Sequence, residues 1–499
     1  MKNYLRGGVL IQKRCEVFEL LSAINPELAI KTKKARTDIA FYFSQALNKP
    51  FVRPDVLQLT VTTRCNLRCK TCNIYEHSSK PEQELSINEM KSIIRQAYLW
   101  GIPTLSILGG EPLLRSDIIP LIEYAKKFGM EVQITTNATL INKELADKLV
   151  DLGLDSVSMS LDGSTAELHD KIRGIKGTFS RVVHGIKTLV YAKQRKKSKK
   201  PWVSVGFTLE NENCGDLIPF LKFAKRIGVN SITYMPYVQD ISNMKLKSDS
   251  DPLWIPDKKI GKLKSDLRRI DSFDSRDFVY RPKNFYLIPS YFQRELKPHE
   301  WKCFVGFMRF NVAPDGNVMM CGDVIGNVRE EKNIISIWES KKAQAARINA
   351  VNCTNPCLQD CLSRPDSDSI SRIAASVLEY TSSLPPEAAK EMRSLIINDI
   401  QEYENAVFSR IMENKKSGHS LEEREQKRLT DCLTETNFAI DELSYEEGQC
   451  SKKGRSRLTA EEREARAKLR KNEHELLMLK KSKGYKFIIK PVSHILSRK

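Results

Sequence analysis

The chain has 499 residues, of which 41% are hydrophobic and 29% are charged. This length predicts two to four domains, and the composition excludes wholesale disorder. No run of 18 apolar residues occurs, which excludes a membrane-spanning helix, and Gln12, Lys13 and Arg14 interrupt the first apolar stretch, so it does not read as a secretory signal. Because most of its 12 cysteines are clustered at metal-ligand spacing, we expect a cytoplasmic protein with reduced thiols.

Positive charge is concentrated near the C-terminal end. The formal net charge is +19, and residues 451–499 hold 16 Lys and Arg against 5 Asp and Glu. A basic tail of this kind contacts nucleic acid, an anionic membrane surface or an acidic protein, or it is simply a solvated helix face. The sequence leaves these alternatives open.

Helices are predicted first, followed by a regular strand–helix alternation. Residues 1–54 predict two amphipathic helices, at 8–24 and 26–46. Ser86 and Glu89 form a capping box for the first helix of the alternating region, and Gly101 follows its end. Six strand–helix units predict a parallel sheet, either doubly wound or curled into an incomplete barrel. The predicted strands are 56–63, 104–108, 131–136, 156–161, 202–209 and 231–235.

After the strand–helix alternation, three segments with different sequence patterns follow. Residues 238–298 have a less regular pattern, and a compact cysteine-bearing segment follows at 301–364. Beyond it the pattern is helical and polar: one helix is expected to begin at Leu384-Pro385-Pro386-Glu387, and capping boxes at 420–423 and 459–462 predict two more. The expected domains are therefore a helical extension, an α/β core, a connecting segment, a cysteine-rich domain and a basic helical extension, at 1–54, 55–240, 241–300, 301–365 and 366–499.

Three cysteines directly after the first strand carry the strongest chemical signal. Cys65, Cys69 and Cys72 have the spacing C-x3-C-x2-C, which chance would produce about 0.007 times in a chain of this cysteine content. Three thiolates on one loop suit a [4Fe–4S] cluster whose fourth iron is left for another ligand. The alternative is a zinc knuckle, with His77 as the fourth ligand.

Further polar and glycine motifs follow the other strands, where the chemistry of α/β folds gathers. Gly109-Gly110-Glu111-Pro112 follows the second strand; paired glycines let the backbone approach a ligand, and the carboxylate can accept hydrogen bonds from an ammonium group. Asn137 follows the third strand, Ser158-x-Ser160-Leu161-Asp162-Gly163 the fourth and Asn213 the fifth. The planar guanidinium of Arg173 suits a carboxylate clamp.

These motifs, in this order over residues 55–240, resemble the radical S-adenosylmethionine (SAM) superfamily. Thr71 and Ala138 depart from it, since the family usually has an aromatic residue before the third cysteine and often has Asn-Gly after the third strand. The resemblance implies a partial (β/α)6 TIM-type barrel, SAM bound to the open iron, an oxidoreductase that forms a 5′-deoxyadenosyl radical, and an electron donor such as flavodoxin or ferredoxin. The residues implied to bind SAM are Gly109, Gly110, Glu111, Asn137, Ser160, Asp162, Arg173 and Asn213.

A second group of cysteines lies in the segment 301–365. Cys303 is followed by Gly316 and Cys321 around a Pro-Asp-Gly turn that predicts a β-hairpin, and Cys353-x3-Cys357-x3-Cys361 closes the segment. The pattern resembles the SPASM/Twitch extension of radical SAM enzymes that modify peptides, proteins and some small molecules. Such extensions carry about seven cysteines for one or two auxiliary clusters, so five predict one auxiliary [4Fe–4S] cluster in a small α+β domain. A structural zinc ribbon is the alternative, and Cys432 and Cys450 would have to join to make seven.

The expected activity is therefore hydrogen abstraction from a peptide or protein, giving an oxidation or a cross-link. Tyr75, His77, Tyr234 and Tyr237 are candidate acid–base groups, and none is assigned a catalytic role. The alternative from another class is a non-catalytic iron–sulfur or zinc protein that binds nucleic acid through its basic helices.

Overall fold

A computed structural model describes most of the chain, in two compact units. The described residues are 26–77, 80–238, 251–273, 278–281, 283–296, 302–353, 357–358, 369–382, 384–416 and 423–444. One unit comprises Met1–Ile39 with Ser369–Lys499, and the other is Ala40–Asp368. The predicted helix at 8–24, the capping-box residues Ser420 and Thr459, the thiols of Cys361 and Cys450, and the basic tail all lie outside the described residues.

The unit Ala40–Asp368 is built on one sheet, in which ten strands are paired among the described residues, in the order β10-β9-β8-β1-β2-β3-β4-β5-β6-β7. The six strands predicted from sequence are neighbours and run parallel, so the α/β class is confirmed. Their bounds differ from the prediction by at most three residues: β1 (Val56–Thr60), β2 (Thr104–Leu108), β3 (Glu131–Thr136), β4 (Ser156–Ser160), β5 (Trp202–Leu209) and β6 (Ser231–Pro236).

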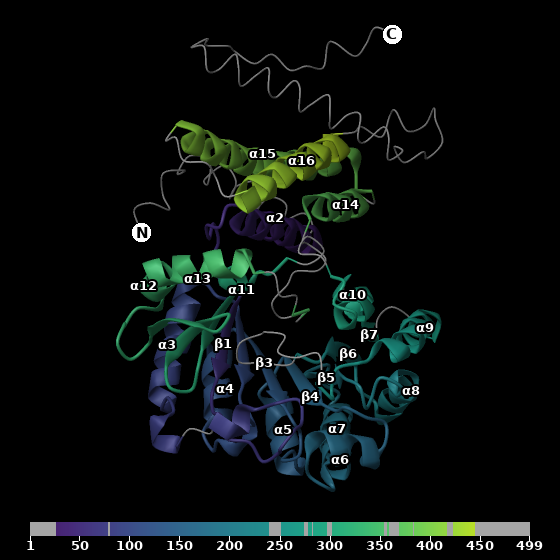
Figure 1. Cartoon of the computed structure of the whole chain (residues 1–499). Coiled ribbons are helices and arrows are strands. Elements are labelled where there is room, and N and C mark those ends of the chain that lie inside the picture. The colour runs from purple at the N-terminus through teal and green to yellow at the C-terminus, as the bar shows by residue number, and fades with distance from the viewer. Residues whose placement is uncertain are drawn as a thin grey trace, which may run out of the picture. The chain divides into compact units, whose positions relative to one another are not determined.

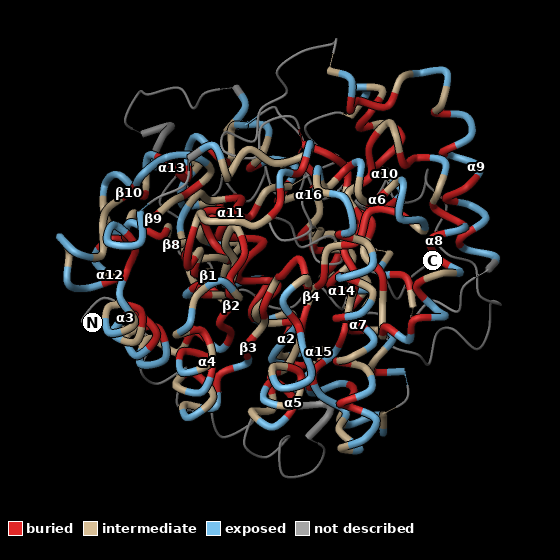
Figure 2. Tube along the Cα trace, turned by 90° about the horizontal axis from the view of Figure 1, so that it is seen from below, coloured by how far each residue is buried: buried red, intermediate tan, exposed pale blue. Residues whose placement is uncertain are grey.

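Helices follow the strands in alternation and cover the sheet (Figures 1 and 2). The capping box of α3 is present: Ser86 Oγ accepts a hydrogen bond from Glu89 N at 3.3 Å, and Glu89 Oε2 accepts one from Ser86 N at 2.7 Å. Gly101 ends α3 with a φ of 89°. The helices are α3 (Ile87–Trp100), α4 (Ile118–Lys127), α5 (Lys143–Asp151), α6 (Ala166–Arg173), α7 (Thr178–Arg195) and α8 (Leu217–Ile227). Short 3-10 turns add η1 (Ile74–His77), η2 (Pro81–Gln83) and η3 (Pro112–Leu114).

Much of the segment expected to be irregular is helical, so that expectation was wrong. It contains α9 (Asp257–Phe273) and α10 (Lys283–Phe292), with β7 (Val279–Tyr280) parallel to β6 between them. Apolar residues of α9 recur at helical spacing and are buried, namely Ile260, Leu263, Leu267 and Ile270. The many charged residues between them obscure this periodicity in the sequence.

The cysteine-bearing segment extends the same sheet. Its elements are α11 (Val305–Met308), β8 (Arg309–Val312), β9 (Asn317–Met320), β10 (Asp323–Asn327), α12 (Ile334–Trp338) and α13 (Lys341–Val351). The predicted hairpin is confirmed, because β8 and β9 pair antiparallel around a turn in which Gly316 has a φ of 88°. β8 also pairs parallel with β1, Val56 lying opposite Arg309. The hairpin is therefore joined directly to the first strand of the α/β core.

The unit Met1–Ile39 with Ser369–Lys499 is helical where it is described. It contains part of α2 (Pro26–Ala46), together with α14 (Ile370–Thr381), α15 (Pro386–Lys416) and α16 (Glu423–Ser444). The predicted helix at 26–46 and the helix start at Pro386 are confirmed. An ion pair of 2.5 Å between Arg36 Nε and Asp399 Oδ2 joins α2 to α15. None of the helices described in either unit is long and apolar enough to cross a membrane.

Candidate functional site

The loop that carries Cys65, Cys69 and Cys72 packs on one side against the loop after β2. Gly110 N donates to Thr62 O at 2.7 Å, and Glu111 N donates to Arg64 O at 2.8 Å. A Cβ atom on Gly110 would lie 2.3 Å from Arg64 O, so only glycine allows this approach. The paired glycines thus do more than leave space for a ligand, because they hold the cysteine loop against the end of β2.

On its other side the cysteine loop packs against the C-terminal end of α6. Arg68 N donates to Arg173 O at 3.2 Å, and Lys70 N donates to Ile172 O at 2.9 Å. Gly174 ends the helix with a φ of 75°, and a Cβ atom there would lie 2.1 Å from Arg68 O. The cysteine loop is therefore held between two backbone segments that follow β2 and β4.

The three thiols lie close enough to influence one another. Cys69 is buried, and Cys65 and Cys72 are half-buried. Burial raises the pKa of the Cys65 and Cys72 thiols, and the charge of Cys69 raises both further. An environment that penalises free thiolates is one in which a bound cation compensates.

A cube of iron and sulfide fits this donor set better than a single ion does. Among the described side chains, no three His, Cys, Asp or Glu groups are arranged to hold one metal ion. The side chain of His77, the expected fourth zinc ligand, lies outside the described part of the chain. A [4Fe–4S] cluster binds each thiolate at a different iron, so its ligands do not meet at one point. Three thiols on one clamped loop match that requirement.

Glu111 ties the loop after β2 to the end of β3. Its carboxylate is fully buried: Oε1 accepts from Thr136 Oγ1 at 2.7 Å and from Leu113 N at 3.0 Å, and Oε2 accepts from Asn137 N at 2.7 Å. Burial raises the pKa of Glu111, and these hydrogen bonds act against the rise. Asn137 Nδ2 in turn donates to Asn66 Oδ1 in the cysteine loop at 2.8 Å. Two of the residues predicted to bind SAM thus also stabilise the loop that carries the thiols.

Asp162 and Asn213 connect the ends of β4 and β5. Asp162 is fully buried and its Oδ1 accepts from Thr208 N at 2.8 Å, while Asn213 Nδ2 donates to the carbonyls of Asp162 and Thr208 at 3.2 and 2.8 Å. Asp162 Oδ2 lies 2.6 Å from Arg173 Nε. Arg173 Nη1 lies 3.7 Å from Cys69 Sγ. The structure therefore brings together the residues predicted after β4 and β5, and it connects them to the cysteine loop. Ser160, the last residue of β4, is half-buried at the same edge of the sheet.

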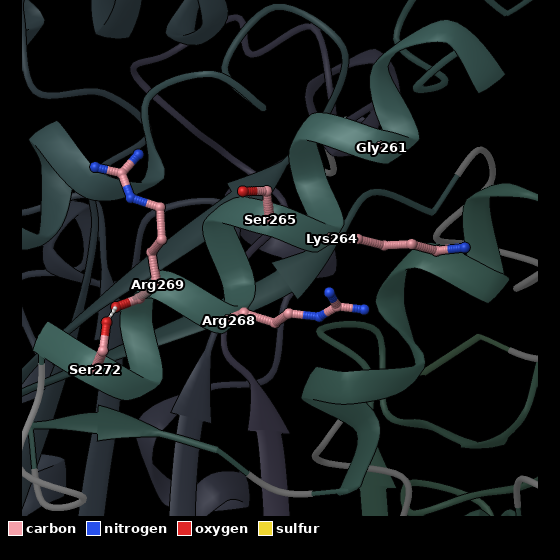
Figure 3. A pocket seen from close by; sticks show the side chains of 6 residues that line it. All are labelled: Gly261, Lys264, Ser265, Arg268, Arg269 and Ser272. Carbon is pink, nitrogen blue, oxygen red and sulfur yellow. Dashed lines mark hydrogen bonds between the residues drawn. The ribbon is translucent and has the colours of Figure 1, made fainter.

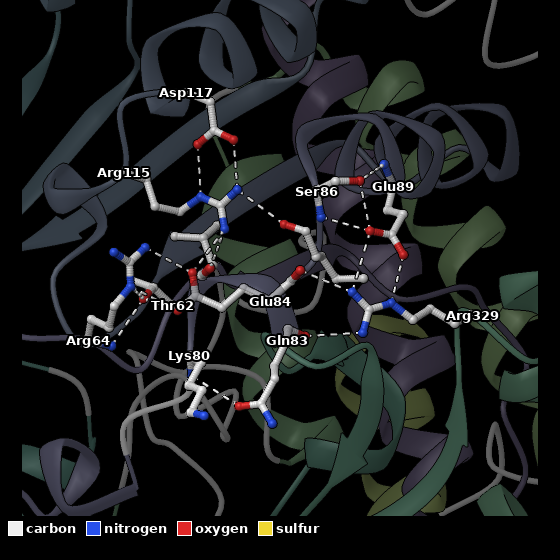
Figure 4. A network of polar contacts seen from close by, with 12 residues as sticks. Thr62, Arg64, Lys80, Gln83, Glu84, Ser86, Glu89, Arg115, Asp117 and Arg329 are labelled. Carbon is white, nitrogen blue, oxygen red and sulfur yellow. Dashed lines mark hydrogen bonds and ion pairs between the residues drawn. The ribbon is translucent and has the colours of Figure 1, made fainter.

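A network of charged side chains that the motifs did not predict surrounds the buried carboxylate of Glu84 (Figure 4). The Glu84 side chain is only 1% exposed, and its Oε2 pairs with Arg64 Nη2 at 3.0 Å and with Arg115 Nη1 at 3.3 Å. Arg64 immediately precedes Cys65. Arg329, which follows β10, donates to Glu84 O at 3.0 Å and pairs with Glu89 at 2.7 Å. The hydrogen bond from Arg329 lowers the pKa of Glu89 to about 2. Only the position of Arg64 beside Cys65 could have pointed to this network.

The second group of thiols also converges. Although part of the residue is exposed, burial of the Cys303 thiol raises its pKa well above the ordinary value, and the charges of Cys357, Cys321 and Cys353 raise it further. Thiols from just before α11, just after β9 and the segment after α13 therefore lie within electrostatic range of Cys303. Cys361, the fifth predicted ligand, lies outside the described residues. Cys214 is a buried thiol that donates to Asn211 O at 3.3 Å.

The acid–base candidates have ordinary structural partners. Tyr234 is buried and its hydroxyl donates to Leu217 O at 2.9 Å, and the hydroxyl of Tyr237 donates to Asp251 at 3.1 Å. The guanidinium of Arg68 lies over the Tyr75 ring, 5.0 Å from its centre. Each of the three tyrosines therefore has a structural contact in the fold.

A basic hollow of about 410 Å³ lies on α9, away from the strand-end motifs (Figure 3). Lys264 and Arg268 point to one side of the helix, and Arg269 points to the other. All six lining residues belong to α9: Gly261, Lys264, Ser265, Arg268, Arg269 and Ser272. This hollow shares no residue with either group of thiols.

Sheet topology, the clamped three-thiol loop and the second thiol group together define an iron–sulfur protein of the α/β class. Comparison with protein families agrees: residues 59–223 match the radical SAM superfamily, and residues 303–362 match an iron–sulfur cluster-binding domain named SPASM. The chain therefore contains a radical SAM domain followed by a SPASM iron–sulfur cluster-binding domain. The radical SAM domain implies SAM and a [4Fe–4S] cluster as cofactors, and the SPASM domain implies auxiliary iron–sulfur clusters.

Several curated proteins are similar to parts of the chain. An AdoMet-dependent heme synthase of Methanosarcina barkeri (strain Fusaro / DSM 804) is 34% identical over 175 residues, covering 35% of this chain and 48% of that protein. An Fe-coproporphyrin III synthase of the same organism is 38% identical over 162 residues, 32% of this chain and 39% of that protein. A probable GTP 3′,8-cyclase of Saccharolobus solfataricus (strain ATCC 35092 / DSM 1617 / JCM 11322 / P2) is 28% identical over 304 residues, 59% of this chain and 89% of that protein.

Among solved structures, Streptococcus suis SuiB aligns with a TM-score of 0.49 and 18% identity, over 68% of this chain and 78% of that chain. The chain spans less than half the length of the two Methanosarcina barkeri proteins it matches.

Proposed function

We propose that the chain reductively cleaves SAM at a cluster held by Cys65, Cys69 and Cys72 and abstracts a hydrogen atom from its substrate. The observation that carries the proposal is the placement of these thiols on a loop clamped between the glycines after β2 and the end of α6. When bound, the cluster supplies one electron to the sulfonium of SAM, which yields methionine and a 5′-deoxyadenosyl radical.

The protein's own part is to fix and enclose the cofactors. The backbone hydrogen bonds to Arg64, Arg68 and Lys70 hold the thiols at the strand ends. Glu111 and Asn137 fix the ends of β2 and β3 around the same place, and Asp162 and Asn213 fix those of β4 and β5. We assign these residues, with Gly109, Gly110 and Ser160, to the walls of the SAM site, because each lies at the carboxyl end of a strand of the parallel sheet or in the segment that follows it. Arg173, at the end of α6, joins them because it contacts both Asp162 and Cys69.

We further propose that Cys303, Cys321, Cys353 and Cys357 hold an auxiliary [4Fe–4S] cluster. The mutual influence of these four thiols supports a single four-thiolate site. In this assignment Cys361 is the spare fifth cysteine. Such a cluster would accept the second electron of an oxidation or bind the substrate directly.

A peptide or protein is the substrate class that we propose. The SPASM domain supports it, because the sequence resembles extensions that serve peptide- and protein-modifying enzymes. The curated relatives are named as an AdoMet-dependent heme synthase, an Fe-coproporphyrin III synthase and a probable GTP 3′,8-cyclase. Proteins with different substrates thus resemble this chain, so we expect substrate choice to reside outside the shared motifs. Flavodoxin or ferredoxin is the proposed electron donor.

Iron analysis and SAM cleavage on anaerobically reconstituted protein test the proposal. We expect about eight irons and eight sulfides per chain for two clusters, and 5′-deoxyadenosine on addition of SAM and dithionite. Cys69→Ala should abolish 5′-deoxyadenosine and remove about half of the iron, whereas Cys303→Ala should remove the other half. Cys432→Ala, which removes a buried thiol of α16, is the matched control and should change neither quantity. Bound zinc with intact SAM would contradict the proposal.

A further inference from the structure

One cation of the site faces a thiol instead of open space. Arg173, the last residue of α6, places Nη1 3.7 Å from Cys69 Sγ and Nε 2.6 Å from Asp162 Oδ2. Its side chain is 11% exposed and that of Asp162 is fully buried. Guanidinium groups donate in a rigid planar fork, so a partner on one edge fixes the direction of the other. Asp162 therefore determines where the Arg173 guanidinium points.

Asp162 is itself immobilised by three neighbouring elements. Its Oδ1 accepts from Thr208 N at 2.8 Å, its backbone N donates to His169 Nδ1 at 3.1 Å, and its carbonyl accepts from Asn213 Nδ2 at 3.2 Å. An arginine guanidinium stays protonated at any ordinary pH, so Arg173 carries a full positive charge next to Cys69. The result is a fixed positive charge beside one particular thiol.

The backbone keeps Arg173 and Cys69 in register. Arg68 N donates to Arg173 O, Lys70 N donates to Ile172 O, and Gly174 permits the close contact. The residues on both sides of Cys69 are therefore bonded to the same helix end that carries the guanidinium. A movement of the cysteine loop relative to Arg173 would break these hydrogen bonds.

We infer that Arg173, oriented by Asp162, donates a hydrogen bond to the Cys69 thiolate and thereby raises the reduction potential of the cluster on the cysteine loop. The inference rests on the cluster of the proposed function and makes Arg173 a positioning residue for it. Reduction adds negative charge to a cluster already bound by thiolates, and a buried cation beside one of them stabilises the reduced form. The role predicted from the sequence, a clamp on the SAM carboxylate, would leave the potential unchanged without SAM.

The test is an EPR-monitored redox titration of the reconstituted full chain in the absence of SAM. The loop cluster is identified as the signal missing in Cys69→Ala. At the potential where half of the wild-type loop cluster is reduced, Arg173→Gln should lower the ratio of reduced to oxidised cluster roughly tenfold, which is about 59 mV for a one-electron couple. The auxiliary cluster in the same sample should keep its potential and serves as the internal control.

Two further variants separate this role from a general loss of charge or packing. Arg173→Lys keeps the charge but cannot span both Asp162 and Cys69, so the reduction potential of its loop cluster should lie between those of wild type and Arg173→Gln. If Arg173→Gln retains no loop cluster, the smaller fall in potential of Arg173→Lys relative to wild type tests the inference instead. Lys70 is an exposed cation on the cysteine loop that pairs with Glu212 in the segment after β5. Lys70→Gln should therefore shift the potential of the loop cluster far less. An unchanged potential in both Arg173 variants, an equal shift in Lys70→Gln, or a shift of the auxiliary cluster as well would overturn the inference.

Failure of this inference can be told apart from failure of the proposed function. The titration needs a cluster on Cys69 but neither SAM nor turnover. If the loop signal is absent in wild type, the proposed function fails. If it is present and insensitive to Arg173, only the inference fails.

Discussion

Glu210, the residue that follows β5, carries a carboxylate whose ionisation should make the stability of the fold depend on pH. Its side chain is fully buried, and Oε2 accepts a hydrogen bond from Glu212 N at 2.9 Å. Oε1 has no hydrogen-bond partner within the described part of the chain. Burial raises the pKa of Glu210 to about 7, and the charges of Glu212 and Asp162 add to the rise. Glu210→Gln replaces this acid with a neutral group of nearly the same shape.

The sign and size of the effect follow from linkage. Because the folded-state pKa lies above the unfolded value of 4.5, the unfolded chain loses its proton first as the pH rises. The stabilisation is complete below about pH 4.5 and is lost as the pH rises through the folded-state pKa of about 7. The difference between the two values corresponds to at most roughly 3 kcal/mol, which residual solvation reduces to about 1–3 kcal/mol. Glu210→Gln should therefore match wild type near pH 5 and be more stable at pH 8.

Thermal unfolding of the reconstituted protein under anaerobic conditions measures this difference. For a domain of this size 1 kcal/mol shifts the Tm by about 2 °C, so the advantage of Glu210→Gln should be about 2–6 °C larger at pH 8 than at pH 5. Glu144→Gln is the control, since its exposed carboxylate has a pKa lowered by Lys148, and it should show no such advantage at high pH. A difference between Glu210→Gln and wild type that does not vary with pH would refute the reasoning.

Two further substitutions test how the cysteine loop and the core are held. Gly174→Ala should force the end of α6 away from Arg68 and lower the amount of iron bound by the cysteine loop. Gly177→Ala is the control, because Gly177 has a similar φ of 81° but open space around it, and this variant should keep the iron. Equal iron content in the two variants would contradict the role of the contact between α6 and the cysteine loop. Trp338→Ala removes a fully buried side chain and should lower the free energy of unfolding by about 3–5 kcal/mol, measured by chemical denaturation. Trp202→Ala, at a half-exposed position, should lower it far less. Similar losses in the two variants would mean that the structure around Trp338 collapses into the space left by the side chain.

Sequence periodicity predicted the parallel sheet because each strand is short, apolar and bounded by turn residues. β2, β3 and β5 have the predicted bounds, whereas β1 ends three residues early. The chain leaves the sheet there because Thr62 and Arg64 give their carbonyls to the loop after β2 instead of to a neighbouring strand. α9 was missed because charged residues alternate with its buried positions. The pairing of β8 with β1 could not be predicted, because no local pattern in either strand specifies a partner about 250 residues away.

The sequence predicted where the residues of the candidate site lie along the chain, but it did not predict which of them contact one another. The motifs place Glu111 after β2, Asp162 after β4 and Arg173 further along the segment that follows β4, and the structure brings all three segments to the cysteine loop. Their partners depend on the three-dimensional fold: Arg173 and Cys69 are separated by 104 positions and meet because the backbone of the cysteine loop bonds to the end of α6. Side chains that sequence motifs assign to ligand binding thus also hold one another in position through direct contacts.

The two groups of thiols are mechanically connected through one strand. β1 leads directly into the cysteine loop, and it pairs with β8, the first strand of the hairpin whose second strand, β9, ends just before Cys321. Arg329 reinforces this connection from the segment after β10, because it bonds to Glu84 O while the Glu84 carboxylate pairs with Arg64 beside Cys65. Glu84 and Arg115 are the buried members of this network, and breaking a buried ion pair is costly. The cysteine loop and the auxiliary segment are therefore expected to keep a fixed spacing, which is what electron transfer between two clusters requires.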